Sequence, residues 1–224
     1  MKIFLSYFIE PLSFFLFAAA FLFYSRKVNP AFRYKTLVVF YLVGTVLLSG
    51  MALKHKSVNS NTYIYNLLYL VSSVFLSYYF STLLNTRLKK TTAVIAGVTT
   101  LAYYSFHIDT PYFDSIGYVI ASTGIVVLIF LYLHQVLTNV TEEPLSLNVD
   151  FWFVCAQLAY HLGSFAIFLS YNYFTQRYMA EGKSPEIGTI LTYLWIVHNV
   201  LLFLSALIIS FGIAWIYRRK SLSS

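Results

Sequence analysis

The sequence predicts an all-α, polytopic membrane protein, a bundle of seven transmembrane helices with the N-terminus outside and the C-terminus inside. Of its 224 residues, 59% are hydrophobic and only 10% are charged, whereas an ordinary soluble domain carries about 25% charged residues. A soluble fold of this composition would expose large apolar patches to water. Lipid is therefore the solvent that the composition fits.

Long apolar runs are the second observation behind this prediction. A spanning helix needs about 20 mostly apolar residues, and its backbone groups must bond within the segment because lipid offers them no partner. The predicted helices cover residues 4–24, 36–53, 63–84, 91–106, 116–137, 151–174 and 187–217. The connections between them are too short for a further domain, so residues 1–224 are expected to form a single transmembrane domain.

The distribution of lysine and arginine is the third observation, and it predicts the orientation. The net charge is +7, but the cations lie in short clusters between apolar runs and not on one face, which argues against a nucleic-acid partner. Seven crossings with the N-terminus outside place ten cations in the cytoplasm and five outside, as the positive-inside rule requires. The expected location is the cytoplasmic (inner) membrane, crossed several times.

The fourth predicted helix, residues 91–106, is the weakest of the seven. It is short and carries polar or tyrosine residues, among them Thr92, Thr99, Thr100, Tyr103 and Tyr104. If this segment does not span, the number of crossings becomes six and the two termini lie on the same side.

Ionisable residues at membrane depth are functional candidates because they are costly to place there. Glu10 lies in the first predicted helix, about two turns from its outer end. His161 and His198 lie near the middle of the sixth and seventh helices. Because these helices run in opposite directions, the two histidines are expected at a similar depth, where their rings can face each other.

Polar residues accompany both histidines at helical spacing. Trp195 and Asn199 share a face with His198, and Ser164 shares a face with His161. Two such stripes make either interhelical hydrogen bonds, which are common in membranes, or a ligand or proton-linked site, or, least favoured, a metal or haem site. The candidate ligand-binding residues are Glu10, His161, Ser164, Trp195, His198 and Asn199.

Several kinds of membrane chemistry are not favoured by the sequence. The last helix has no lysine for a retinal Schiff base, and Glu10 has no second intramembrane carboxylate with which to form an acid pair. The acidic ligands that a zinc hydrolase needs are also missing from the second to fifth helices. We predict no catalytic residue, metal or cofactor.

Part of the last third of the chain resembles small seven-helix bacterial membrane proteins without an assigned activity. The resemblance rests on Phe151-Trp152-Phe153, Tyr160, Gly163-Ser164-Phe165 and Leu194-Trp195-Ile196-Val197-His198-Asn199. It implies an accessory role beside sensor histidine kinases and brings no catalytic residue with it.

The expected function is a receptor-like or sensor-accessory module with a polar pocket among the first, sixth and seventh helices. The alternative is a small-molecule carrier or channel, although no internal repeat supports it. A membrane-embedded lipid or haem enzyme ranks third. The expected partners are the lipid bilayer, a membrane signalling protein or a second copy of the chain, and a small-molecule ligand.

Overall fold

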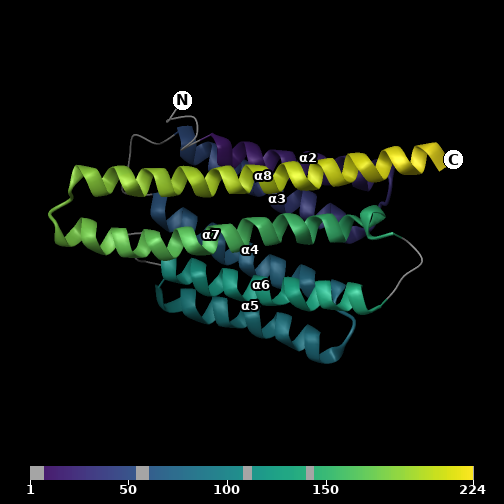
Figure 1. Cartoon of the computed structure of the whole chain (residues 1–224), viewed down its shortest axis with the longest axis horizontal. Helices are drawn as coiled ribbons and strands as arrows, with labels where there is room; N and C mark the ends of the chain where they lie inside the picture. The colour runs from purple at the N-terminus through teal and green to yellow at the C-terminus, as the bar shows by residue number, and fades with distance from the viewer. Residues whose placement is uncertain (1–7, 54–60, 108–112, 140–143, 224) are drawn as a thin grey trace. The chain divides into compact units, whose positions relative to one another are not determined.

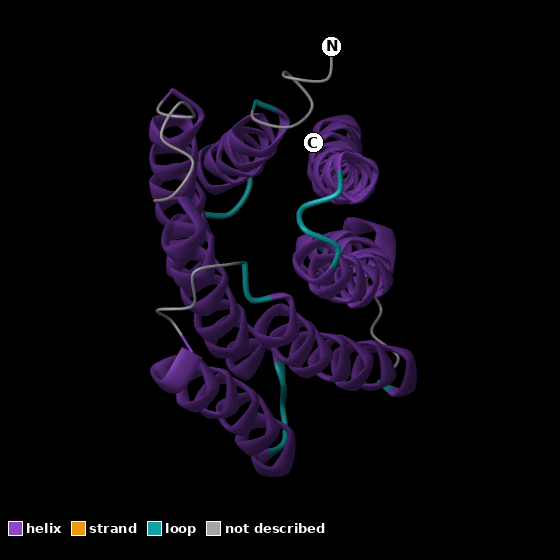
Figure 2. Cartoon of the chain, turned by 90° about the vertical axis from the view of Figure 1, so that its left-hand side faces the viewer, coloured by secondary structure: helices purple, strands orange, loops and turns teal. Residues whose placement is uncertain are grey.

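The computed structural model describes residues 8–53, 61–107, 113–139 and 144–223, and its regular secondary structure in these ranges is entirely helical (Figure 2). This confirms the all-α prediction. The α-helices, labelled in Figure 1, are α2 (Ile9–Lys27), α3 (Phe32–Leu53), α4 (Asn61–Leu83), α5 (Arg87–His107), α6 (Ser115–Thr138), α7 (Val149–Ala180) and α8 (Pro185–Ser223). A short 3-10 helix, η1 (Leu145–Leu147), precedes α7.

Each predicted segment overlaps one of these α-helices, but several helices extend further than their apolar runs. Residues 4–7 of the first prediction lie outside the described residues. Helix α7 continues to Ala180, where Arg177 and Glu181 form an ion pair one turn apart at its end. Gly182, with a φ of 66°, then turns the chain, and Pro185 occupies the first position of α8, a position that proline favours.

Six helices in the described part of the chain are long and apolar enough to cross a membrane, namely α2, α3, α4, α6, α7 and α8. This indicates a multi-pass membrane protein. Helix α5 has 21 residues, a length of about 32 Å at 1.5 Å per residue, but it is less apolar than the other six. The hydroxyls of Thr91, Thr92, Thr100 and Ser105 each bond the carbonyl oxygen four residues back, so much of the polarity of α5 is satisfied within the helix.

The chain divides into two compact units, and two of the boundaries between them fall within α7 and α8. Unit 1 comprises residues 1–54, 141–160 and 199–224, and unit 2 comprises residues 55–140 and 161–198.

In unit 1, aromatic rings hold α2 against α3 and the first part of α7. Phe17 stacks on Tyr41 with 4.5 Å between ring centroids. Phe21 meets Phe153 edge to face at 5.4 Å. The Gln157 side-chain amide donates a hydrogen bond of 3.2 Å to the Tyr41 hydroxyl, which adds a buried polar link between α3 and α7.

An ion pair joins the beginnings of α3 and α7 in the same unit. The Arg33 guanidinium lies 2.6 Å from the carboxylate of Asp150 and donates a second hydrogen bond to the Tyr34 hydroxyl. The Asp150 side chain is only 7% exposed and that of Arg33 39%, so the carboxylate is buried and the cation half-buried.

In unit 2, helices α4, α5 and α6 pack against one another in all three pairings (Figure 1). The Ser73 hydroxyl donates to that of Thr100 at 3.2 Å, which links α4 to α5. Gly124 of α6 faces Ala96 of α5 so closely that a Cβ there would lie 3.2 Å from that of Ala96. Small residues thus let α5 and α6 approach closely, as is common between membrane helices.

Candidate functional site

His198 lies in the interior of unit 2 and is hydrogen-bonded through both ring nitrogens. Its Nε2 is 2.9 Å from the Tyr69 hydroxyl of α4, and its Nδ1 is 3.0 Å from the Ser164 hydroxyl of α7. The His198 side chain is fully buried. A neutral imidazole has one donor and one acceptor, and hydroxyls can serve as either, so this single ring ties α4, α7 and α8 together.

His161 makes a similar contact to a fourth helix, α6. Its Nδ1 lies 3.1 Å from the hydroxyl of Ser122 on α6, and both side chains are buried. The contact links α6 to α7 within unit 2.

Aromatic side chains connect the two histidines. The Tyr118 ring centroid lies 6.4 Å from that of His161 and 5.8 Å from that of His198. Phe168 packs against Tyr118 at 4.1 Å and against His198 at 4.6 Å. Both imidazoles therefore contact the same tyrosine. We call Tyr69, Tyr118, Ser122, His161, Ser164 and His198 the histidine cluster.

Trp195 lies one helical turn before His198 at the centre of a half-buried aromatic group. Its ring centroid is 5.0 Å from Tyr65, 5.4 Å from Phe113 and 6.2 Å from Tyr171. Tyr65 belongs to α4, Tyr171 to α7 and Trp195 to α8, and Phe113 lies just before α6. We call these four residues the aromatic cluster. The Trp195 ring also lies 5.6 Å from the His198 ring, so the two clusters are in contact.

Asp114 begins α6 and organises polar groups from three helices. Its Oδ1 accepts hydrogen bonds from the Gly117 backbone N–H at 2.9 Å and from the Tyr103 hydroxyl at 3.2 Å. Its own backbone N–H donates to Asn66 Oδ1 at 3.1 Å. Gly117 has no room for a side chain, since a Cβ would lie 2.8 Å from Asp114 Oδ2.

The candidate residues are divided between the two units. His161, Ser164, Trp195 and His198 belong to unit 2, where Ser164 and Trp195 both contact His198. Glu10 and Asn199 belong to unit 1. Glu10 lies in the first turn of α2 and is 2% exposed, and Asn199 is fully buried.

Tyr69 and Ser122, which bond the two histidines, and Asp114 were not predicted from the sequence. A sequence signal for Tyr69 was present in α4. Four polar or tyrosine residues recur there at intervals of three or four, and all are buried: Asn66, Tyr69, Ser73 and Ser77. Asp114 directly precedes the apolar run of α6, which is the position of an N-cap aspartate.

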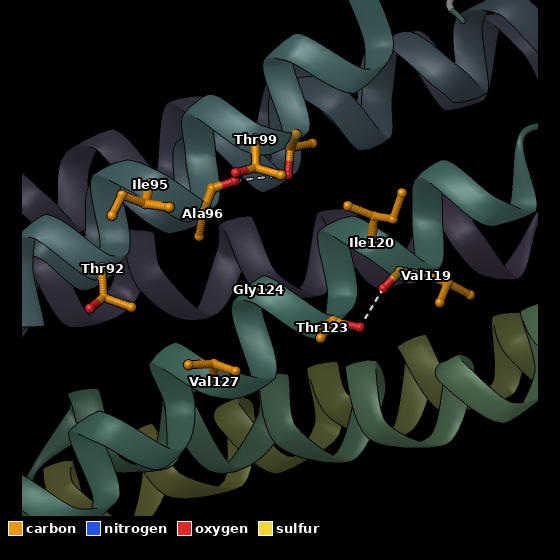
Figure 3. Close-up of a pocket in the computed structure, with 10 residues that line it drawn as sticks. Thr92, Ile95, Ala96, Thr99, Val119, Ile120, Thr123, Gly124 and Val127 are labelled. Atoms are coloured by element: carbon orange, nitrogen blue, oxygen red, sulfur yellow. Dashed lines mark hydrogen bonds between the residues drawn. The ribbon is translucent and has the colours of Figure 1, made fainter.

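A groove of about 390 Å³ between α5 and α6 has a different character (Figure 3). Its wall is made of aliphatic side chains and threonines, and the hydroxyls of Thr100 and Thr123 bond carbonyl oxygens of their own helices. None of its lining residues belongs to the histidine cluster. The groove therefore offers an apolar surface and no ionisable group.

Metal ligation has little support in the ranges that the structure describes. No three histidine, cysteine, aspartate or glutamate side chains there lie close enough together to hold an ion. Cys155, in unit 1, is a half-buried free thiol. His198 already uses both ring nitrogens in hydrogen bonds to hydroxyls. The histidine cluster connects helices by hydrogen bonds and places the His198 ring beside the aromatic cluster.

Comparison of the chain with protein-family models, with curated proteins and with solved structures found no match.

Proposed function

We propose that the chain is a receptor-like or sensor-accessory module of the bacterial cytoplasmic membrane. In this proposal all seven helices cross the bilayer, with the N-terminus outside and the C-terminus inside. The aromatic cluster binds a small ligand with an apolar or cationic face. Binding shifts the histidine cluster, and its hydrogen bonds transmit the shift to the surrounding helices.

The packing of α5 supports its inclusion among the crossing helices. It runs alongside α4 and α6, with Ser73 bonded to Thr100 on one side and Ala96 against Gly124 on the other. A helix packed along two spanning neighbours shares their depth. The internal hydrogen bonds of its hydroxyls reduce the cost of placing it in lipid.

The charges at the helix ends support the orientation. If the chain crosses the bilayer at every helix, one set of alternate ends carries ten cations in the described residues: Arg26, Lys27, Arg33, Lys35, Arg87, Lys89, Lys90, Arg218, Arg219 and Lys220. The opposite set carries Arg177 and Lys183 in the same ranges, while Lys2, Lys54 and Lys56 lie outside them. The positive-inside rule then places the first set in the cytoplasm.

The single observation that carries the signalling proposal is the position of His198. Its ring contacts Trp195 of the aromatic cluster and is hydrogen-bonded to Tyr69 and Ser164. A ligand that moves Trp195 must therefore shift either the His198 ring or its hydrogen bonds. Helix displacements of about 1 to 2 Å are a common form of such switching.

The form of the helices favours this proposal over a carrier. Secondary transporters bind substrate at discontinuous helices near the membrane midplane. In the described residues, α4, α6, α7 and α8 run without interruption, and both histidines are engaged with hydroxyls of neighbouring helices.

The test compares His198→Phe with His134→Phe in the bacterium that carries the gene. Both variants replace a histidine of unit 2 by phenylalanine, but His134 is exposed on α6 and lies outside the histidine cluster. Transcripts and the depletion of solutes from the medium are measured in the wild type, in a deletion strain and in both variants. Immunoblots of the membrane fraction control for protein level, and Ser164→Ala serves as a milder second variant.

We expect His198→Phe and Ser164→Ala to reproduce transcript changes of the deletion, with unchanged solute depletion, while His134→Phe behaves as the wild type. If the deletion alters solute depletion and leaves transcripts unchanged, the carrier alternative replaces the receptor proposal. Wild-type transcripts in both cluster variants at normal protein level would exclude a signalling role for His198.

A further inference from the structure

A basic pocket lies at the C-terminal end of α8 in unit 1. It has a volume of about 320 Å³ and is lined by Arg219 and Lys220 together with Leu147 and Leu222. Two cations thus stand beside two aliphatic side chains in one concave surface. This combination matches a ligand that has an anionic head and an apolar body.

The pocket is built on an ordered framework. The Arg219 guanidinium lies over the Trp215 ring, 4.6 Å from its centroid, a geometry that favours one position of a long side chain. On the other side, the Trp152 indole N–H donates a hydrogen bond of 2.9 Å to the Ser146 carbonyl, which holds η1, and with it Leu147, against α7.

Gly212 connects this framework to α8. A Cβ at Gly212 would lie 2.3 Å from the Trp152 ring, so the ring packs directly on the backbone of α8. The chain of contacts therefore runs from α8 through Trp152 to Ser146 and Leu147. Both walls of the pocket are fixed relative to each other inside unit 1.

The depth of the pocket follows from its neighbours along α8. Tryptophan and tyrosine gather at membrane interfaces, and here Trp215 and Tyr217 come just before the cations. Helix α8 has 39 residues, well beyond the about 20 that cross a bilayer, so its last turns continue past the apolar core. Arg219 and Lys220 then lie at headgroup level.

We propose that this pocket binds the phosphate group of an anionic phospholipid, with Leu147 and Leu222 against the first part of its acyl chains. Basic pockets on the cytoplasmic side of membrane helices suit such headgroups. The leucines favour a lipid over free phosphate, and the interfacial aromatic residues favour it over an acidic peptide. This inference rests on the membrane placement proposed above, but not on the signalling role.

The test uses the full chain in nanodiscs of phosphatidylcholine, with and without phosphatidylglycerol. The pocket variant is R219Q/K220Q. The matched control is R26Q/K27Q, which removes the same charge from exposed positions at the end of α2 in the same unit. Native mass spectrometry measures retained lipid, and thermal unfolding measures stabilisation.

We expect the wild type and R26Q/K27Q to retain phosphatidylglycerol over phosphatidylcholine and to unfold at higher temperature in its presence. In R219Q/K220Q the preference should fall at least threefold. An equal fall of the phosphatidylglycerol preference in both variants would show that any cationic surface suffices and would overturn the site. A wild type without this preference would overturn it as well.

Two further arms identify other ligands. If millimolar inorganic phosphate in pure phosphatidylcholine reproduces the stabilisation, the site takes a soluble anion and not a lipid. Binding of an oligoglutamate peptide without any effect of phosphatidylglycerol would point to an acidic protein partner and overturn the lipid proposal.

A separate measurement tests whether the wild type resists alkaline extraction from membranes. If the wild type is extracted, the membrane placement is contradicted. If it resists extraction but shows no lipid preference, only the lipid-binding inference is overturned.

Discussion

Tyr69 and His198 are 129 residues apart in the sequence and 2.9 Å apart in unit 2, where the tyrosine hydroxyl meets the imidazole Nε2. The contact joins α4 to α8, two helices that no short loop connects. Hydrogen bonds between membrane helices contribute about 0.6 kcal/mol on average and up to about 1.7. This one also fixes the orientation of a ring that touches Trp195.

Tyr69→Phe tests the strength of this link. The change removes the hydroxyl and keeps the ring that packs on Tyr118 at 4.8 Å. Leaving a buried imidazole nitrogen without its partner should lower the free energy of unfolding by about 1 kcal/mol, or about 2 to 4 °C in the unfolding temperature. Tyr78→Phe is the control, because Tyr78 is on the same helix and 60% exposed. Equal shifts in the two variants would contradict the interhelical role.

Gly212→Ala tests the packing of the Trp152 ring against Gly212 in unit 1. The new methyl group would overlap the indole ring, and overpacking of this kind typically costs about 1 to 3 kcal/mol. Gly50→Ala on α3 is the control, since a Cβ there meets nothing within 4 Å, and alanine is the better helix former. Thermal unfolding should separate the two variants clearly. An unchanged midpoint for Gly212→Ala would show that Trp152 can move without cost.

Asp114→Ala tests the cap of α6. The loss of the bond from the Gly117 N–H should cost about 0.5 to 2 kcal/mol, and the Tyr103 hydroxyl loses its acceptor as well. Glu186→Ala is the comparison, because Glu186 is an exposed acid in the first turn of α8. Hydrogen exchange should show faster exchange in the first turn of α6 for Asp114→Ala alone. Protection equal to that of the wild type would rule out the capping role.

Arg33→Gln tests the ion pair of unit 1. Asp150 would keep the Tyr34 hydroxyl at 3.4 Å but lose its cation while remaining buried. We expect a loss of about 1 to 2 kcal/mol, between the values for exposed and buried pairs. Lys35→Gln removes the same charge from an exposed position of α3 and should have little effect. A double-mutant cycle with Asp150→Asn measures the coupling, and a coupling of zero would refute the contribution of the pair.

The helices were predictable because lipid imposes a simple pattern on sequence, but their ends were not. Hydropathy indicates where a helix meets lipid and not where it ends, so the polar last turns of α7, with the Arg177–Glu181 pair, went unseen. The polarity of α5 made the prediction of its crossing the weakest of the seven. A hydropathy index counts Thr100 as polar, although its hydroxyl bonds Ala96 of the same helix.

The candidate site was predictable only in its local part. Helical spacing relates Trp195 to His198, whose rings lie 5.6 Å apart, whereas Ser164, predicted on the face of His161, bonds His198 of α8. Helical spacing does not reveal that Tyr69 bonds His198, because that pairing depends on how distant helices pack. With 20 tyrosines in the chain, composition alone does not distinguish this one from those of an aromatic belt. The assignment of Glu10 to unit 1 likewise depends on tertiary contacts.

The seven crossings proposed for the chain are tested most directly by the labelling of single cysteines. With Cys155 changed to Ser, no other cysteine remains. Asn85→Cys, Glu186→Cys and Ser221→Cys then place one thiol each at exposed positions before α5, at the start of α8 and near its end. Seven crossings predict that a membrane-impermeant maleimide labels the Glu186 position in intact cells and the other two only after permeabilisation. Labelling of the Asn85 and Glu186 positions from the same side would contradict the crossing of α5 and with it the seven-helix arrangement.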